Sequence, residues 1–222
     1  MNHPEELSSM QPRLNHGLEA VLRRVRVVPV LTIDKLEDAV PLAKALVAGG
    51  LDVLEITLRT KAALAAIREM VRHVPGAMIG AGTVLTPAQG ADAMAHGSRF
   101  IVSPGMTPGL IEAASAWPVP FLPGVATASE AMALADMGYR VLKFFPAEPA
   151  GGTAALKALG APLSDLVFCP TGGIDAVKAA SYLALPNVAA VGGSWVAPAK
   201  LVAAGDWAGI TALASATSGR HP

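Results

Sequence analysis

The stretch Val141-Leu142-Lys143-Phe144-Phe145-Pro146 is one of eight short segments with high β-strand propensity that recur along the chain. The segments begin about 20 to 26 residues apart, a spacing that fits one strand, one helix and two short loops per unit. Each segment is therefore predicted to be a buried strand. The eight predicted strands are 27–33, 53–58, 78–84, 100–104, 120–125, 141–146, 167–172 and 189–195.

Segments rich in alanine and leucine separate these strands and are predicted to be helices. The clearest are Leu36–Ala48, Lys61–His73, Pro87–Ala95, Ser129–Met137 and Asp175–Leu183. Several follow residues that cap helix starts, namely Asp34, Thr86-Pro87, Thr107-Pro108 and Asp175. The alternation of strand and helix predicts parallel strands joined by right-handed crossovers.

Eight consecutive βα units predict a closed (β/α)8 TIM barrel of the α/β class, whose functional residues lie at the carboxyl ends of the strands. We expect one domain with the barrel over residues 27–216. The leader, residues 1–26, is expected to contribute an additional N-terminal helix, from about Glu5 to Arg26, that covers the barrel floor. A doubly wound open sheet is the alternative, and it is disfavoured because no G-x-G-x-x-G motif follows the first strand.

Composition limits the classes of partner. The chain has 222 residues, of which 52% are hydrophobic, so it can bury a large core. It carries 17 basic and 17 acidic side chains, which predicts no nucleic-acid or membrane-surface partner. The first 25 residues lack a signal-peptide core, and a single cysteine, Cys169, fits a reducing compartment. We therefore expect a cytoplasmic protein.

Lys143 is an ionisable residue in an otherwise apolar strand. Burial disfavours the charged form of an amine, and the neutral form is a nucleophile that condenses with ketones to a Schiff base. The alternative is structural, with the side chain extending along apolar surface and its ammonium in water. Phe145, two residues further along the strand, is expected on the same face, as a wall of the lysine pocket.

Glu55 is a second ionisable residue in an apolar strand. Because side chains alternate along a strand, Glu55, Thr57 and, if the strand continues, Arg59 are expected on one side. Glu55 would then serve in proton transfer, or alternatively form a structural ion pair with Arg59. In the mouth of one barrel, Lys143 and Glu55 can approach each other, which predicts a catalytic pair.

Two glycine pairs end the last two predicted strands, in Pro170-Thr171-Gly172-Gly173 and Gly192-Gly193-Ser194-Trp195. Backbone N–H groups at such positions bind anions, and these two loops often hold phosphate in barrels of this type. No metal ion or cofactor is expected, because the histidines have no ligand spacing and none ends a strand. They are His3, His16, His73, His96 and His221.

Six motifs, in order from about Arg26 to Ala204, resemble those of the 2-keto-3-deoxy-6-phosphogluconate and 4-hydroxy-2-oxoglutarate aldolases. They are Glu55-Ile56-Thr57-Leu58-Arg59-Thr60, Gly80-Ala81-Gly82-Thr83-Val84, Ser103-Pro104-Gly105, Lys143-Phe144-Phe145-Pro146-Ala147-Glu148, Pro170-Thr171-Gly172-Gly173 and Gly192-Gly193-Ser194-Trp195. The resemblance implies a class I aldolase that forms pyruvate and D-glyceraldehyde 3-phosphate. It also implies a homotrimer and a small keto-acid phosphate as substrate.

The resemblance also implies residue roles. Lys143 would form the Schiff base and Glu55 would transfer protons. Arg59, Thr83 and the backbone amides near Pro104 would bind the pyruvyl carboxylate. Thr171 would contact the substrate hydroxyls, and Phe145 would lie over the Schiff base. The distal phosphate would be bound by Gly172, Gly173, Gly193 and Ser194.

Two other functions are compatible with these residues. A phosphosugar isomerase or epimerase would use Glu55 as base and Lys143 as an electrostatic clamp. A non-catalytic phosphate-metabolite-binding protein would use neither. Within the aldolase reading, the six-carbon phosphorylated acid, its C4 epimer and 4-hydroxy-2-oxoglutarate all stay open as substrates.

Overall fold

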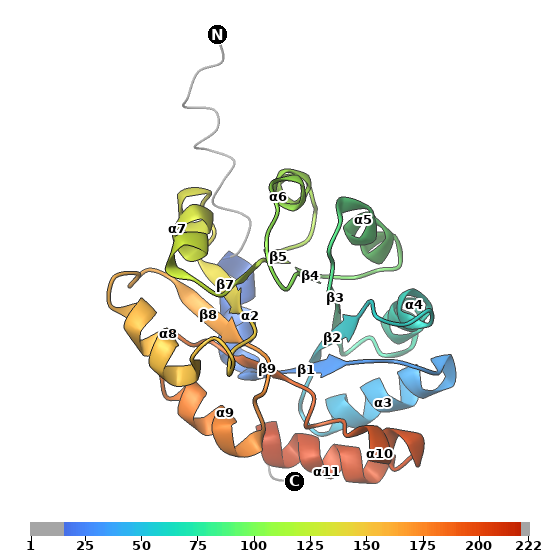
Figure 1. The fold of residues 1–222 in the computed structure, drawn as a ribbon. Helices are drawn as coiled ribbons and strands as arrows, with labels where there is room; N and C mark the ends of the chain where they lie inside the picture. The colour runs from blue at the N-terminus through green and yellow to red at the C-terminus, as the bar shows by residue number, and fades with distance from the viewer. Residues whose placement is uncertain (1–15, 219–222) are drawn as a thin grey trace.

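The computed structural model describes residues 16–218, in which short parallel strands form a curled sheet surrounded by helices (Figure 1). The strands are β1 Val27–Leu31, β2 Val53–Thr57, β3 Met78–Gly82, β4 Ile101–Val102, β5 Phe121–Leu122, β6 Gly124–Val125, β7 Val141–Phe144, β8 Val167–Pro170 and β9 Val191–Gly193. The helices are α2 His16–Val25, α3 Leu36–Ala48, α4 Ala63–His73, α5 Pro87–Ala95, α6 Pro108–Ser115, α7 Ala128–Asp136, α8 Gly152–Gly160, α9 Ala176–Leu183, α10 Ala199–Ala203 and α11 Trp207–Ser218.

The strands pair in parallel in two groups. Six strands follow the order β5-β4-β3-β2-β1-β9, and three follow the order β6-β7-β8. Isolated parallel bridges join Phe168 to Val188 and Thr171 to Gly192, which brings the end of β8 beside β9. The arrangement is TIM-barrel-like, and it places the loops that follow all strands at one end of the sheet.

The predicted fifth strand is divided in two. Pro123 separates β5 from β6, and a proline has no N–H to donate to a strand ladder. The Pro123 carbonyl nevertheless accepts from the Lys143 backbone N–H at 2.8 Å, so the break still leaves this segment beside β7. The other seven predicted strands are present, but each ends one or two residues earlier than expected.

Three of the four predicted helix caps are confirmed. The side chains of Thr86, Thr107 and Asp175 accept hydrogen bonds from the backbone N–H groups three residues later. The prediction for Asp34 is wrong, since α3 begins after Lys35, whose side chain makes no capping bond. Acidic side chains at positions 37 and 38 instead favour the helix start through its dipole.

Buried apolar side chains form two layers. The larger lies between the strands and the outer helices and includes Leu142 and Phe144 of β7. The smaller lies inside the curled sheet and includes Val141 of the same strand, as the alternation of side chains predicts.

Helix α2 contributes Leu18, Leu22 and Val25 to the inner layer, which also contains Val28 of β1 and Val53 of β2. The part of the predicted leader helix before His16 lies outside the described residues. No helix within residues 16–218 combines the length and apolar character that crossing a membrane requires.

Candidate active site

Lys143 and Glu55 meet inside the curled sheet. Lys143 lies on β7 and Glu55 on β2, and the distance from Nζ to Oε1 is 3.2 Å. Both residues are at least 95% buried. The sequence prediction that these two residues approach each other is therefore confirmed, and the alternative in which Lys143 extends its ammonium into water is wrong.

The buried Lys143 amine is therefore paired with a carboxylate and is not isolated. A carboxylate at this distance stabilises the ammonium, and the desolvation of both groups opposes the charge separation. The hydrogen bond between Nζ and Oε1 offers a direct path for a proton to pass from the lysine to the carboxylate. A neutral amine can thus form without releasing a proton to water.

Gly82, the last residue of β3, leaves the space that the Glu55 side chain occupies. A Cβ atom at Gly82 would overlap Cγ, Cδ and Oε1 of Glu55. The register of β2 with β3 sets Thr57 opposite Gly82, so the glutamate side chain extends along the strand direction toward the glycine. The motif glycine at position 82 is required by this packing.

Given the proton-transfer role expected for Glu55, Gly82→Ala should lower kcat by about 100-fold, because displacing a catalytic group by about 1 Å has an effect of that size. Overpacking should also lower the free energy of unfolding by about 1–3 kcal/mol. Steady-state kinetics and urea denaturation measure the two effects. Gly76→Ala is the matched control at the other end of β3, where the nearest atom is 3.8 Å from the added carbon. Unchanged kcat in Gly82→Ala would contradict the proposed confinement of Glu55.

Thr83 follows directly with an unusual backbone conformation. Its φ angle is +61°, in the left-handed region that β-branched residues rarely adopt. Strain of this kind costs about 1–3 kcal/mol and concentrates at functional sites. Thr83 is half-buried and directly follows Gly82, the glycine that contacts Glu55. The strained backbone at Thr83 thus lies beside the charged pair.

The placement predicted for Arg59 needs correction. Strand β2 ends at Thr57, and residues 58 and 59 form a turn, so the alternation of side chains does not extend to Arg59. Arg59 is exposed beyond the carboxyl end of the strand, whereas Glu55 is paired with Lys143. The alternative of a structural Glu55–Arg59 pair is not supported.

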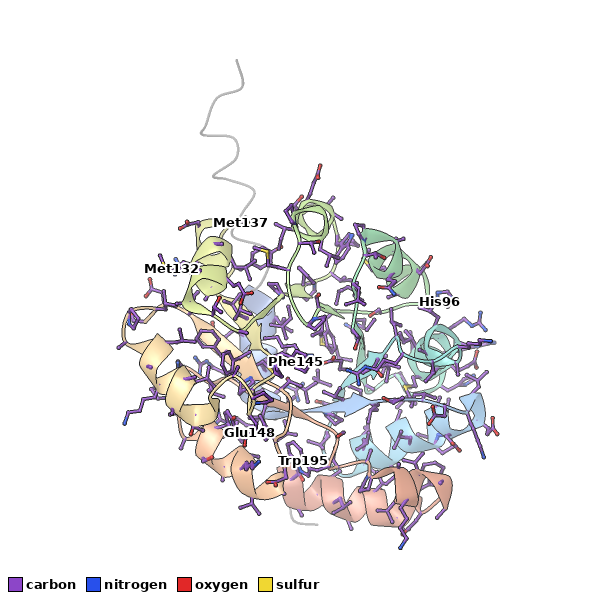
Figure 2. All side chains as sticks on the ribbon, in the orientation of Figure 1. His96, Met132, Met137, Phe145, Glu148 and Trp195 are labelled. Carbon is purple, nitrogen blue, oxygen red and sulfur yellow. The ribbon has the colours of Figure 1, made fainter. Side chains whose placement is uncertain are left out.

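Phe145 forms one wall of the lysine site, as expected. The centroid of its ring lies 5.5 Å from Lys143 Nζ. Figure 2 shows Phe145 near the centre of the ring of helices, with Glu148 and Trp195 further out toward α9 and α11. A Cβ atom on Gly172 would lie 3.3 Å from the edge of the Phe145 ring, so the first glycine of the 172–173 pair packs against this wall.

Thr171 and Cys169 continue the site along β8. Cys169 is the strand neighbour of Lys143, and burial raises the pKa of its thiol to about 12. The thiol therefore stays neutral at physiological pH and does not compete as a nucleophile. Thr171 is buried, and its side chain fills the space that a Cβ on Gly192 would occupy.

The Ser103-Pro104-Gly105 segment lies over β6. The Gly124 N–H donates to the Gly105 carbonyl at 3.2 Å, and a Cβ on Gly124 would overlap the Pro104 carbonyl group. Gly124 is in turn the strand neighbour of Lys143. The half-buried Pro104 is thereby brought to the strand end next to the lysine.

Ser194 directly follows the end of β9. It is exposed and lines a cavity of about 470 Å³ together with Thr32, Asp34 and Lys35 from the loop after β1. A Cβ at Gly193 would overlap the Trp195 ring, so this glycine is needed for packing as well as for a backbone site. The loop after β1 was not predicted to belong to the site, since it carries no motif.

Sequence reasoning also missed a polar cluster beside Gly173. Glu148 follows the lysine strand and contacts Lys178 and Tyr182 of α9. Its position five residues after Lys143 was the available signal. Within residues 16–218, no three histidine, cysteine, aspartate or glutamate side chains gather as a metal site would require.

The order of these residues along the chain agrees with a known family. A model of the KDPG and KHG aldolases matches residues 18–213. The chain belongs to this aldolase family. The KHG/KDPG aldolase of Escherichia coli (strain K12) is 50% identical over 196 residues, covering 88% of this chain and 92% of the relative. The 2-dehydro-3-deoxy-phosphogluconate aldolase of Dickeya dadantii (strain 3937) is 52% identical with the same coverage.

Solved aldolase structures resemble this chain over most of its length. A KDPG aldolase from Legionella pneumophila, with pyruvate captured as a covalent carbinolamine intermediate, has a TM-score of 0.88 and 48% identity, covering 90% of this chain and 97% of that one. The 2-keto-3-deoxy-6-phosphogluconate aldolase of Zymomonas mobilis ZM4 with 3-phosphoglycerate has a TM-score of 0.87 and 48% identity, covering 92% and 96%.

Proposed function

We propose that this protein is a class I aldolase that cleaves 2-keto-3-deoxy-6-phosphogluconate into pyruvate and D-glyceraldehyde 3-phosphate through a Schiff base on Lys143. The single observation that carries the proposal is the buried Lys143–Glu55 pair, 3.2 Å apart. Such a pair supplies a nucleophilic nitrogen and a proton carrier at one place. Membership in the aldolase family supports the same chemistry.

The first half of the reaction forms the imine. Glu55 takes a proton from the Lys143 ammonium, and the neutral Nζ adds to the C2 carbonyl carbon of the substrate. The resulting carbinolamine loses its hydroxyl as water, with Glu55 returning a proton to the departing oxygen. The iminium that remains carries a positive charge at the carbon next to C3, where it accepts electrons.

The second half breaks the carbon–carbon bond. The Glu55 carboxylate removes the proton of the C4 hydroxyl, the C3–C4 electron pair moves into the iminium, and the aldehyde leaves. Glu55 then returns this proton to C3 of the enamine. Water adds to C2, the C–N bond breaks, pyruvate departs and Lys143 is regenerated. Every proton is accounted for by one carboxyl group and water.

The proposal also assigns substrate contacts at the strand ends. Arg59, Thr83 and the amides near Pro104 hold the pyruvyl carboxylate, for which a guanidinium is suited by its planar fork. Thr171 contacts the substrate hydroxyls, and Phe145 lies against the Schiff base. The distal phosphate is held by backbone and hydroxyl groups of Gly172, Gly173, Gly193 and Ser194.

The proposal extends to the assembly and the substrate range. The two parallel sheets close into one (β/α)8 barrel domain with α2 over its floor, supported by the bridge from Thr171 to Gly192. The enzyme also acts on 4-hydroxy-2-oxoglutarate. It works as a cytoplasmic homotrimer, which light scattering on a size-exclusion column tests.

Reduction with borohydride in the presence of pyruvate tests the chemistry. We expect a stable adduct whose mass equals that of reduced pyruvyl-lysine, located at Lys143 by peptide mass spectrometry. A phosphosugar isomerase with the same residues would yield no adduct. Labelling at a different lysine, or none, would contradict the proposal.

A further inference from the structure

The loops that follow β7 and β8 are joined by a cluster of polar side chains. Glu148, from the first loop, accepts a hydrogen bond on Oε1 from the Tyr182 hydroxyl at 2.5 Å. Its Oε2 lies 2.7 Å from Nζ of Lys178. Lys178 and Tyr182 both belong to α9, which follows the Gly172-Gly173 turn. We call Glu148, Lys178 and Tyr182 the loop clamp.

The clamp controls the glycine turn itself. Lys178 Nζ donates to the Gly173 carbonyl at 3.2 Å, and the Glu148 backbone N–H donates to the Gly172 carbonyl at 3.1 Å. Gly172 and Gly173 have φ angles of +107° and +77°, so their conformation is open only to glycine. A Cβ at Gly173 would lie 2.8 Å from Cβ of Glu148, which packs directly on the turn.

These contacts define which groups the turn offers to a ligand. In a trans peptide the C=O and the N–H point in opposite directions. The Glu148 backbone N–H and Lys178 Nζ bind the carbonyls of Gly172 and Gly173. The N–H groups of Gly173 and Ile174 therefore point away from Glu148 and Lys178. Two neighbouring N–H groups at the start of a helix are an arrangement that binds an anion.

The charges of the clamp support each other. The hydrogen bond from Lys178 lowers the pKa of Glu148, and the hydrogen bond to Glu148 raises the pKa of Lys178. Both groups therefore remain ionised near neutral pH, and the carboxylate offsets the lysine charge. Lys178 is thus held on the Gly173 carbonyl.

We propose that Glu148 is a positioning residue for the distal phosphate of the substrate, acting through Lys178 and Tyr182 to turn the amides of Gly173 and Ile174 toward it. The inference rests on the proposed aldolase function. The proposal predicts that the enzyme discriminates between its two substrates. The reason is that 4-hydroxy-2-oxoglutarate carries no phosphate and gains no binding energy from an ordered glycine turn. The clamp would thus favour the phosphorylated substrate without touching the reacting atoms.

Kinetics of Glu148→Gln on the two substrates test the proposal. We expect KM for 2-keto-3-deoxy-6-phosphogluconate to rise about tenfold or more with little change in kcat, since uniform binding is lost. Activity on 4-hydroxy-2-oxoglutarate should change by less than about twofold. Inhibition by inorganic phosphate should weaken in parallel. Equal losses on both substrates, or no loss on either, would overturn the proposal.

Further variants separate positioning from direct binding by the lysine. Lys178→Met should reproduce the rise in KM, Lys178→Arg should restore most of the affinity, and Tyr182→Phe should have a smaller effect because only one hydrogen bond is lost. If Lys178→Met raises KM while Glu148→Gln leaves it unchanged, Lys178 binds the phosphate directly and the clamp proposal fails.

The matched control is Asp165→Asn. Asp165 and Arg140 form an exposed pair, 3.2 Å apart, that joins the chain before β7 to the chain before β8, at the opposite end of the same two strands. This variant should leave kcat and KM unchanged for both substrates. Borohydride trapping with pyruvate should be normal in Glu148→Gln. Loss of trapping already in the unmodified enzyme would instead overturn the proposed function, so the two failures are distinguishable.

Discussion

Lys143→Met is expected to reduce kcat by at least about 10⁴-fold, because the variant has no nitrogen that can form the Schiff base. It should also abolish borohydride trapping with pyruvate. Lys143→Arg, which retains a cation beside Glu55, should be equally inactive. An isomerase that used the lysine only as a clamp would retain measurable activity in the arginine variant, so this comparison separates the two chemistries.

The same substitution should affect folding. Removing Lys143 leaves the Glu55 carboxylate buried without its partner at 3.2 Å, and losing one member of a buried pair costs about 3–5 kcal/mol. The double variant Lys143→Met/Glu55→Gln should recover much of this stability while remaining inactive. Urea denaturation of both single variants and the double variant measures the coupling. Full additivity would contradict the paired state.

Glu55→Gln is expected to lower kcat by about 10²–10⁴-fold, the usual contribution of a positioned acid–base group. The amide cannot accept and return the protons of carbinolamine formation, cleavage and enamine protonation. The lysine remains, so a reduced adduct with pyruvate should still form, but more slowly.

The control for Glu55→Gln is Glu69→Gln, at a carboxylate on α4 that forms only surface pairs with Arg68 and His73. It should leave kcat unchanged. Rates of imine formation, followed by trapping at timed intervals, locate the affected step. A wild-type kcat in Glu55→Gln would remove this residue from the mechanism.

Much of the site was predictable because it depends on periodic features. The alternation of side chains along β7 directs Lys143 inward and Leu142 and Phe144 toward the helices. The predicted barrel sets its second and sixth strands around one interior, so Glu55 and Lys143 could be expected to face each other. Turn glycines at 172 and 173 follow from their position at a strand end.

The features that were missed depend on contacts between particular side chains. The fit of Glu55 against Gly82 and the contact of Glu148 with Lys178 join segments whose relative positions no local pattern sets. Strand ends were also overestimated, which led to the wrong placement of Arg59. Side-chain alternation is reliable only while the backbone remains extended, and strand β2 ends two residues before this arginine.

The two members of the charged pair lie 88 positions apart in sequence. Neither half of the chain therefore holds a competent centre, and a ribosome must complete most of the polypeptide before the lysine gains its carboxyl neighbour. During refolding, catalytic activity should accordingly appear together with the last cooperative folding step. Turnover is therefore a sensitive measure of complete folding of the chain.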